Sequence, residues 1–146
     1  MSIPNEVTNL LKNEKFCFLA TSHRDQPHVC LMNFTFIEDE GIVVLSSREE
    51  TTKVDHIKRN PSVSLLLYNL GKSIDASLSV TLNGTATIAN NAEEARYREE
   101  HYRKNSDMET FIKGDNILVI AVKIDHGLIS DYRDSVFEWS LEQEEN

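Results

Sequence analysis

The stretch LSSREETTKVDHIKRNPSVSLLL, from Leu45 to Leu67, has a strand pattern at each end and a helix pattern between them. Val54 and Ile57 share one face at helical spacing. The Asn60–Pro61 pair ends the helix, because the residue before a proline disfavours helical backbone. The first strand meets the helix in a cluster of hydroxyls and cations: Ser46, Ser47, Arg48, Thr51, Thr52 and Lys53. This stretch therefore predicts a strand–helix–strand unit with a polar helix start.

Two interpretations explain the polar helix start. Ser47-x-x-Glu50 has the spacing of a capping box, and so does Ser46-x-x-Glu49. Alternatively, unpaired N–H groups at the first turn, hydroxyl donors and the charge of Lys53 form a phosphate site. The two interpretations are compatible, since one helix start can be capped and still hold a phosphate.

Alternating apolar residues predict strands on both sides of this unit, with Gly41 closing a hairpin and Gly84 as a bending point. The predicted strands are 15–23, 28–37, 42–47, 62–68, 78–89 and 116–124, and the predicted helices are 3–12, 51–59 and 90–105. Residues 69–78 are a predicted loop or hairpin connection. The pattern predicts a mainly β fold with flanking helices, a six-stranded antiparallel barrel whose closure removes exposed edges. Strands that are apolar on both faces predict that helices or a second subunit cover part of the outer surface.

The length and composition predict one soluble domain. A chain of 146 residues suits a single domain over 1–146, with an acidic, ragged tail from about residue 140. A net charge of −9 argues against nucleic acid as a partner. No apolar run approaches the roughly 20 residues of a membrane span, and the N-terminus lacks a signal-peptide pattern, so we expect a cytoplasmic protein. Cys17 and Cys30 lack zinc-site spacing and predict packed thiols without a metal.

Several kinds of catalytic motif are missing from the sequence. The five glycines stand at positions 41, 71, 84, 114 and 127, which excludes a Rossmann fingerprint and a P-loop. Five scattered histidines show no spacing that pairs a nucleophile with a base: His23, His28, His56, His101 and His126. We therefore assign no catalytic acid or base, and any enzyme activity would depend on a cofactor that carries the chemistry.

An ordered set of short motifs resembles one known family. Residues 15–69 contain an LAT strand, a QPHV turn and strand, a strand ending in hydroxyls, a TTK helix start and NPSVSLL, and VTLNGTATI follows later. Together they resemble the core of the pyridoxamine 5'-phosphate oxidase-like, FMN-binding split-barrel family. The resemblance covers about residues 14–90 well and residues 115–130 loosely.

The resemblance implies an FMN-binding flavoprotein, an oxidoreductase acting on an unidentified small molecule, with FMN at a homodimer interface. The segment that borders the flavin ring falls on His28, Val29, Cys30, Leu31, Met32 and Asn33. The strand-end hydroxyls of the family fall on Ser46 and Ser47, and its phosphate-binding helix start falls on Thr51, Thr52 and Lys53. A contact from the partner subunit falls near Ser79.

This chain departs from the true oxidases of the family at three of those positions. The oxidases carry arginine, lysine and arginine where this chain has His28, Asn33 and Thr52, and loss of the three cations predicts weaker FMN binding. Trp139 is not followed by the basic segment of the oxidases, which argues against pyridoxamine phosphate oxidation. Trp139 is predicted to pack the tail against the barrel or the partner, and Arg133 is a further candidate to approach the cofactor.

Three alternatives remain open on the same fold. One is a non-catalytic module that stores, senses or delivers flavin or haem, with His126 as the candidate axial ligand. Another is use of the deazaflavin F420. The last is a barrel without a cofactor that serves as a dimeric interaction domain.

Overall fold

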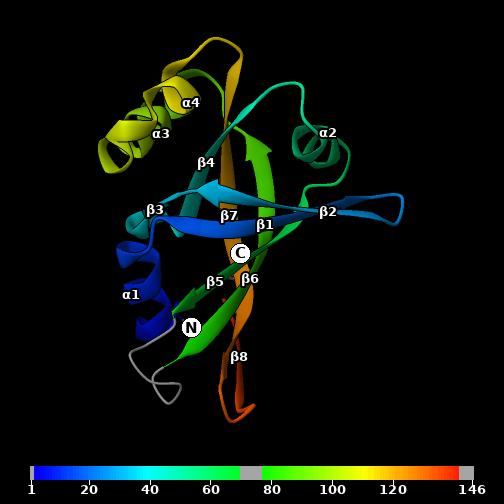
Figure 1. Ribbon diagram of the computed structural model, residues 1–146, viewed down its shortest axis with the longest axis vertical. Helices are drawn as coiled ribbons and strands as arrows, with labels where there is room; N and C mark the ends of the chain where they lie inside the picture. Colours follow the sequence, from blue (N-terminus) through cyan, green and yellow to red (C-terminus); the bar gives the residue numbers. More distant parts are fainter. Residues whose placement is uncertain (1, 70–76, 142–146) are drawn as a thin grey trace, which may run out of the picture.

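One curled antiparallel sheet organises the chain (Figure 1), in a computed structural model that describes residues 2–69 and 77–141. Its strands are β1 (Phe16–His23), β2 (Gln26–Asn33), β3 (Thr35–Ile37), β4 (Ile42–Arg48), β5 (Ser62–Asn69), β6 (Leu78–Ile88), β7 (Ile117–Asp131) and β8 (Val136–Ser140). The helices are α1 (Asn5–Asn13), α2 (Thr52–Arg59), α3 (Asn91–Lys104) and α4 (Glu109–Lys113), with 3₁₀ turns η1 (Glu38–Glu40) and η3 (Ser106–Met108). The predicted connection at 69–78 and the predicted acidic tail lie largely outside the described residues.

The strands run in the order β2-β1-β5-β6-β7-β4-β3, and β8 pairs with β7. The sheet curls into a half-barrel, which confirms the predicted mainly β, split-barrel class with flanking helices. The two ends of the order, β2 and β3, follow each other in the chain through Phe34 and are not joined by a ladder among the described residues. The barrel is therefore split, because its seam is bridged by the chain and not by strand pairing.

The described residues form eight strands, two more than predicted. The predicted strand 28–37 divides into β2 and β3 at Phe34, whose side chain is fully buried and whose backbone N–H donates to the carbonyl of Lys15. The strand β8 was missed because its sequence is short and follows an acidic turn. The helix α4 was also missed, since five residues are too few to show a helical period.

Two glycines on the long strands mark places where the backbone must approach a neighbour closely. The β6–β7 register shifts at Asn83/Gly84, and a Cβ at Gly84 would lie 2.2 Å from the Lys123 carbonyl oxygen, so the predicted bend is confirmed. A Cβ at Gly127 would lie 2.7 Å from Cζ2 of Trp139. The Trp139 ring therefore occupies the space above Gly127, and its 4% exposure confirms that it packs the tail against the barrel.

Helices cover part of the sheet, as predicted. The helix α1 buries Val7, Leu10 and Leu11 against the main core. The helix α3 places Tyr97 in a second cluster with Val44 of β4. None of the described helices is long and apolar enough to cross a membrane.

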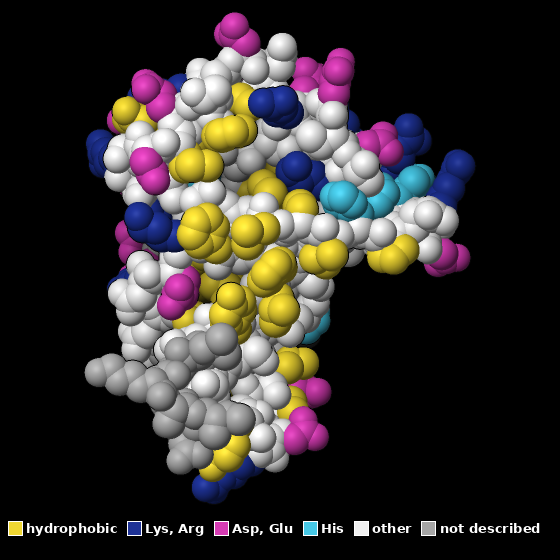
Figure 2. Space-filling model, in the orientation of Figure 1, with side chains coloured by type: hydrophobic (Ala, Val, Ile, Leu, Met, Phe, Trp, Pro, Cys, Tyr) yellow, Lys and Arg dark blue, Asp and Glu magenta, His cyan; other side chains and the backbone are white. Residues whose placement is uncertain are grey.

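None of the described helices covers one outer face of the sheet. We call it the β1–β2–β5 apolar face, and Figure 2 shows hydrophobic side chains gathered across the middle of the molecule. Its exposed residues are Phe16, Val29, Leu31, Leu66 and Tyr68. Val29 and Leu31 are 63% and 58% exposed, which is unusual for neighbouring aliphatic side chains on one strand face.

Candidate functional site

A hollow of about 270 Å³ opens where β2 and β4 end and α2 begins, with α3 and α4 on its far side. It brings together three sequence segments that were predicted to act together. The predicted residues that line it are Leu31, Met32, Asn33, Ser46, Ser47, Thr51 and Lys53. Arg48, which belongs to the cluster of hydroxyls and cations seen in the sequence, also lines it. The lining residues that the sequence did not indicate are His101, Met108, Phe111, Ile112 and Ile117. The hollow is therefore a candidate ligand site built from two separate parts of the chain, residues 31–53 and 101–117.

The start of α2 forms one end of the hollow, which we call the cationic end. Thr51 is the N-cap of α2, and its hydroxyl accepts a hydrogen bond from the Val54 N–H at 3.4 Å. The predicted capping box at Ser47 is wrong, because the Ser47 hydroxyl donates to the Arg48 carbonyl at 3.0 Å. The backbone N–H groups of the first turn, at Thr52 and Lys53, have no acceptor within the helix. These donors remain available for an anion.

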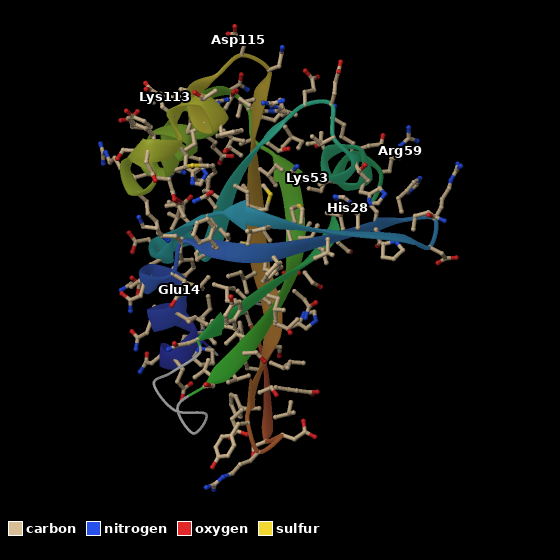
Figure 3. The ribbon with its side chains drawn as sticks, viewed as in Figure 1. Glu14, His28, Lys53, Arg59, Lys113 and Asp115 are labelled. Carbon is tan, nitrogen blue, oxygen red and sulfur yellow. The ribbon has the colours of Figure 1, made fainter. Side chains whose placement is uncertain are left out.

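Two cations line the cationic end and no carboxylate does. Figure 3 shows Lys53 extending from α2 toward the space that α3 and α4 face, whereas Arg59 lies on the outer side of the helix. The Arg48 guanidinium lies 5.9 Å from the centroid of the Phe111 ring. Glu49 and Glu50 line a separate hollow on the other side of Arg48. The acidic residues beside the helix start therefore do not oppose an anion in this site.

The opposite end of the hollow, which we call the neutral end, is formed by a hydrogen-bonded network. His101 Nδ1 lies 2.8 Å from the Thr35 hydroxyl. The Asn105 side-chain amide nitrogen donates to the His101 carbonyl at 3.1 Å and to the Thr35 hydroxyl at 3.2 Å. Asn33 donates to the Asn105 side-chain oxygen at 3.2 Å, which leaves its own carbonyl oxygen free to accept from a ligand.

Burial keeps the neutral end uncharged. Desolvation, assisted by the nearby charge of Lys104, lowers the pKa of His101 to about 4, so its imidazole is neutral near pH 7. The Lys104 ammonium points away from the hollow, where it donates to the Glu14 carbonyl at 2.7 Å and lies 4.1 Å from the Phe34 ring centroid. Figure 3 labels Glu14, which follows α1. Between the two ends, the hollow is lined by apolar side chains.

A protein-family model matches most of the chain. A family model described as pyridoxamine 5'-phosphate oxidase matches residues 3–129. The chain belongs to the pyridoxamine 5'-phosphate oxidase-like family. A pyridoxamine 5'-phosphate oxidase homolog of Schizosaccharomyces pombe is 31% identical over 97% of this chain and 93% of its own length. The resemblance of the sequence to this family is thereby confirmed.

Solved structures of proteins with different names have the same fold. A haem-binding protein from Mycobacterium smegmatis superposes with a TM-score of 0.81 at 17% identity, over 96% of this chain and 60% of that one. A FAD-binding protein from Mesorhizobium loti superposes with a TM-score of 0.74 at 17% identity, over 85% of this chain and 89% of that one. At this identity the likeness shows the fold alone.

Four of the residues predicted from the family pattern do not line the hollow: His28, Val29, Cys30 and Thr52. Val29 belongs to the β1–β2–β5 apolar face, and Thr52 is exposed on α2. His28 packs edge-on against His56, with ring centroids 6.2 Å apart. No group of three metal-ligating side chains in the described residues is placed to hold a metal ion.

Cys30 lies beside the hollow and remains a thiol. Burial raises its pKa, and the charge of Lys53 offsets part of that rise. Burial also raises the pKa of Cys17 to about 12, and both cysteines are free. The prediction of packed thiols is confirmed for Cys17, which is fully buried, while Cys30 is only half-buried.

Three further candidates from the sequence lie outside this chain's own hollow. Ser79 is on β6 opposite Tyr68, and Arg133 is in the exposed turn between β7 and β8. His126 lines another hollow of about 420 Å³ beside Asn83 and Asp125. None of the three contributes to the 270 Å³ hollow of the same chain.

Proposed function

We propose that this chain binds FMN in the 270 Å³ hollow and acts as an FMN-dependent oxidoreductase on a small molecule. One observation carries the proposal: a single hollow joins a cationic helix start, an apolar middle and a neutral end that offers hydrogen bonds. FMN has the same order of parts, a phosphate joined through a polar chain to a flat ring with polar edges.

The cationic end suits the phosphate. A phosphate beside Thr51 and Lys53 would meet the free N–H groups of the first turn of α2, the partial positive charge of the helix start and an ammonium group. Arg48 adds a second cation on the same side. The three cations that the oxidases carry at His28, Asn33 and Thr52 are absent, so we expect these two to provide most of the charge.

The rest of the hollow suits the flavin ring. Leu31 and Met32 of β2 and Phe111 of α4 provide apolar contacts for a flat ring system. The free carbonyl oxygen of Asn33 would accept a hydrogen bond from a ring N–H. A bound flavin supplies hydride or electron transfer, and the chain supplies its position, its anchor and the hydrogen bonds at its edge.

We further propose that two copies of the chain complete the site in a cytoplasmic homodimer. The hollow is smaller than the roughly 300–1,000 Å³ of typical cofactor sites, so one chain forms only part of the enclosure. Leu31 lines the hollow and also belongs to the β1–β2–β5 apolar face, which makes the two continuous. A second copy on that face would cover exposed apolar surface and would bring residues near Ser79 toward the flavin.

An absorption spectrum after addition of FMN, followed by equilibrium dialysis, tests the cofactor proposal. We expect retention of about one FMN per chain and a dimer by sedimentation. Complete loss of FMN at micromolar protein would overturn the flavin assignment, and a monomer in the presence of FMN would overturn the shared site.

A second candidate, haem binding, is favoured by the haem-binding protein among the structural neighbours. His126 is exposed and lines the 420 Å³ hollow, which adjoins a smaller apolar hollow through Ala20 and Ser64. The same spectrum separates the candidates, since haem added to the protein would give a Soret band that His126→Ala shifts. F420 is the third cofactor to titrate, and failure of all three would favour a dimeric interaction domain.

A further inference from the structure

His101 is a buried polar residue that the proposed phosphate and ring contacts leave unused. It lies near the end of α3, is 1% exposed, and lines the hollow. A buried imidazole normally satisfies both ring nitrogens, because an unpaired polar atom in a protein interior is costly. Only Nδ1 of His101 has a partner among the described residues.

The partners of Nδ1 indicate which nitrogen carries the proton. The Asn105 side-chain nitrogen lies within hydrogen-bond distance of the Phe34 and His101 carbonyl oxygens, which identifies it as a donor. The same nitrogen lies 3.2 Å from the Thr35 hydroxyl oxygen and 3.3 Å from His101 Nδ1, so an N–H on Nδ1 would face another donor. The only acceptor within reach of the Thr35 hydroxyl proton in the described network is His101 Nδ1, at 2.8 Å. A neutral imidazole that accepts at Nδ1 carries its proton on Nε2.

The Nε2–H group is therefore a donor without an acceptor among the residues that the structure describes. Among the described residues, only one side-chain N or O atom is both fully buried and without a hydrogen-bond partner, and it is Trp139 Nε1. His101 Nε2 also lacks a partner among them, so it is not fully buried. It is therefore accessible from the hollow that His101 lines. Met108, Phe111 and Ile112 are the apolar residues that η3 and α4 contribute to the same hollow. The cations Arg48 and Lys53 belong to the opposite, cationic end.

We propose that His101 is a positioning residue that donates a hydrogen bond from Nε2–H to an uncharged acceptor, a carbonyl oxygen or ring nitrogen of the bound ligand. This inference deepens the proposed flavin site and rests on it. The acceptor has two possible sources: the ring of the flavin itself, or a carbonyl of a second molecule bound beside the flavin. In both cases the neutral end selects an uncharged group, because a single neutral donor among apolar side chains does not compensate a desolvated phosphate or carboxylate.

Two matched variants separate the ligand contact from the internal contact. His101→Asn places an amide oxygen near the position of Nδ1, which retains the bond to Thr35, and is too short to replace Nε2–H. His101→Gln can place an amide N–H near the position of Nε2 and loses the bond to Thr35. The Asn variant should therefore lose ligand affinity and retain stability, and the Gln variant should do the reverse.

The first readout is the ¹⁵N spectrum of the histidine side chains in the protein without ligand. We expect His101 to show a protonated Nε2 and an unprotonated Nδ1 at pH 7. A protonated Nδ1 or an imidazolium would overturn the proposal regardless of any ligand.

The second readout is binding of three probes, each compared at equal folded fraction. Riboflavin carries the flavin ring without phosphate, and FMN carries both. The neutral 1,4-naphthoquinone, titrated into FMN-loaded protein, presents a carbonyl from a second molecule. Its 2-sulfonate is the charged control and should bind at least tenfold more weakly than the neutral quinone.

The probes distinguish the two sources of the acceptor. If the flavin ring is the acceptor, His101→Asn weakens riboflavin and FMN equally, by about three- to tenfold, and His101→Gln recovers most of it. If a second molecule is the acceptor, only naphthoquinone binding weakens. No change with any probe, or equal binding of the neutral and sulfonated quinones, would overturn the proposal. If the wild type binds neither flavin, the proposed function fails, and the role of His101 is then decided by naphthoquinone binding to the unloaded chain.

Discussion

The two ends of the hollow are built to hold ligands in different ways. The cationic end is formed by one short segment, residues 46–53, where a capped helix start and two flexible cations face an open space. The neutral end is formed by Asn33, Thr35, His101 and Asn105, which come from distant parts of the chain and are held in place by each other. The cationic end therefore offers charge, while the neutral end offers hydrogen-bonding groups whose orientation is fixed by buried hydrogen bonds.

The pH dependence of stability has the largest expected effect. The unfolded His101 takes a proton near pH 6.5, whereas the folded residue takes one only near pH 4, so the unfolded state binds more protons between these values. Stability therefore falls as pH drops from 6.5 to 4, by up to about 3 kcal/mol from this residue. Urea unfolding gives the free energy of unfolding of the wild type and of His101→Asn across this pH range. The difference between the two slopes of free energy against pH is the contribution of His101. Equal slopes would show that folding does not lower the pKa of His101, which would contradict an uncharged neutral end.

Loss of the Lys53 ammonium has the next largest effect. Lys53→Ala should weaken FMN binding by about 10- to 150-fold, since a charge-assisted hydrogen bond contributes roughly 1.5–3 kcal/mol. Riboflavin, which lacks the phosphate, should bind the variant as it binds the wild type. Fluorescence titration measures both, and Lys58→Ala is the control because Lys58 is exposed on the same helix. Equal losses for both flavins would mean that Lys53 does not act on the phosphate.

Removal of the helix cap has a smaller effect, on stability in the absence of ligand. Thr51→Ala loses the hydroxyl that accepts from the Val54 N–H and should lower the free energy of unfolding by about 1 kcal/mol. The neighbouring variant Thr52→Ala should change it by less than about 0.5 kcal/mol, because Thr52 is exposed. Chemical denaturation compares the two. A larger loss of stability from Thr52→Ala than from Thr51→Ala would show that Thr51 is not the cap of α2.

Arg48 should contribute least. It is exposed and stacks loosely on Phe111, so Arg48→Ala should weaken FMN binding by about two- to fivefold. The control is Arg59→Ala, on the outer side of α2, which should leave the affinity unchanged. A loss from Arg48→Ala that exceeds the loss from Lys53→Ala would move the phosphate from the helix start toward β4.

The same contrast explains what the sequence could predict. The cationic end lies within eight consecutive residues, so strand, helix and hydroxyl patterns are visible together in one short stretch. The positions of β1, β4, α2 and β5 follow from local alternation and from Asn60–Pro61, and the structure places them within one or two residues of the prediction. The cap residue was misassigned because four hydroxyls stand near the helix start and spacing alone does not choose among them.

The neutral end was not predictable by the same reasoning. Thr35 and His101 are 66 positions apart, and Asn33 and Asn105 are 72 apart, so only the folded sheet and α3 bring them together. His101 stands in the most highly charged helix of the sequence, where a surface position was the natural expectation. A partial signal was available: Tyr97 and His101 are four residues apart, and both prove to be fully buried on one face of α3.

The contact between Trp139 and Gly127 gives the protein a built-in optical reporter. The chain has a single tryptophan, and it lies on β8 with its ring above a glycine of β7. Any event that detaches this last strand transfers the indole from a dry interior to water and shifts its emission to longer wavelength. Intrinsic fluorescence therefore follows one identified strand, so partial peeling of the C-terminal edge can be distinguished from global unfolding without attaching a label.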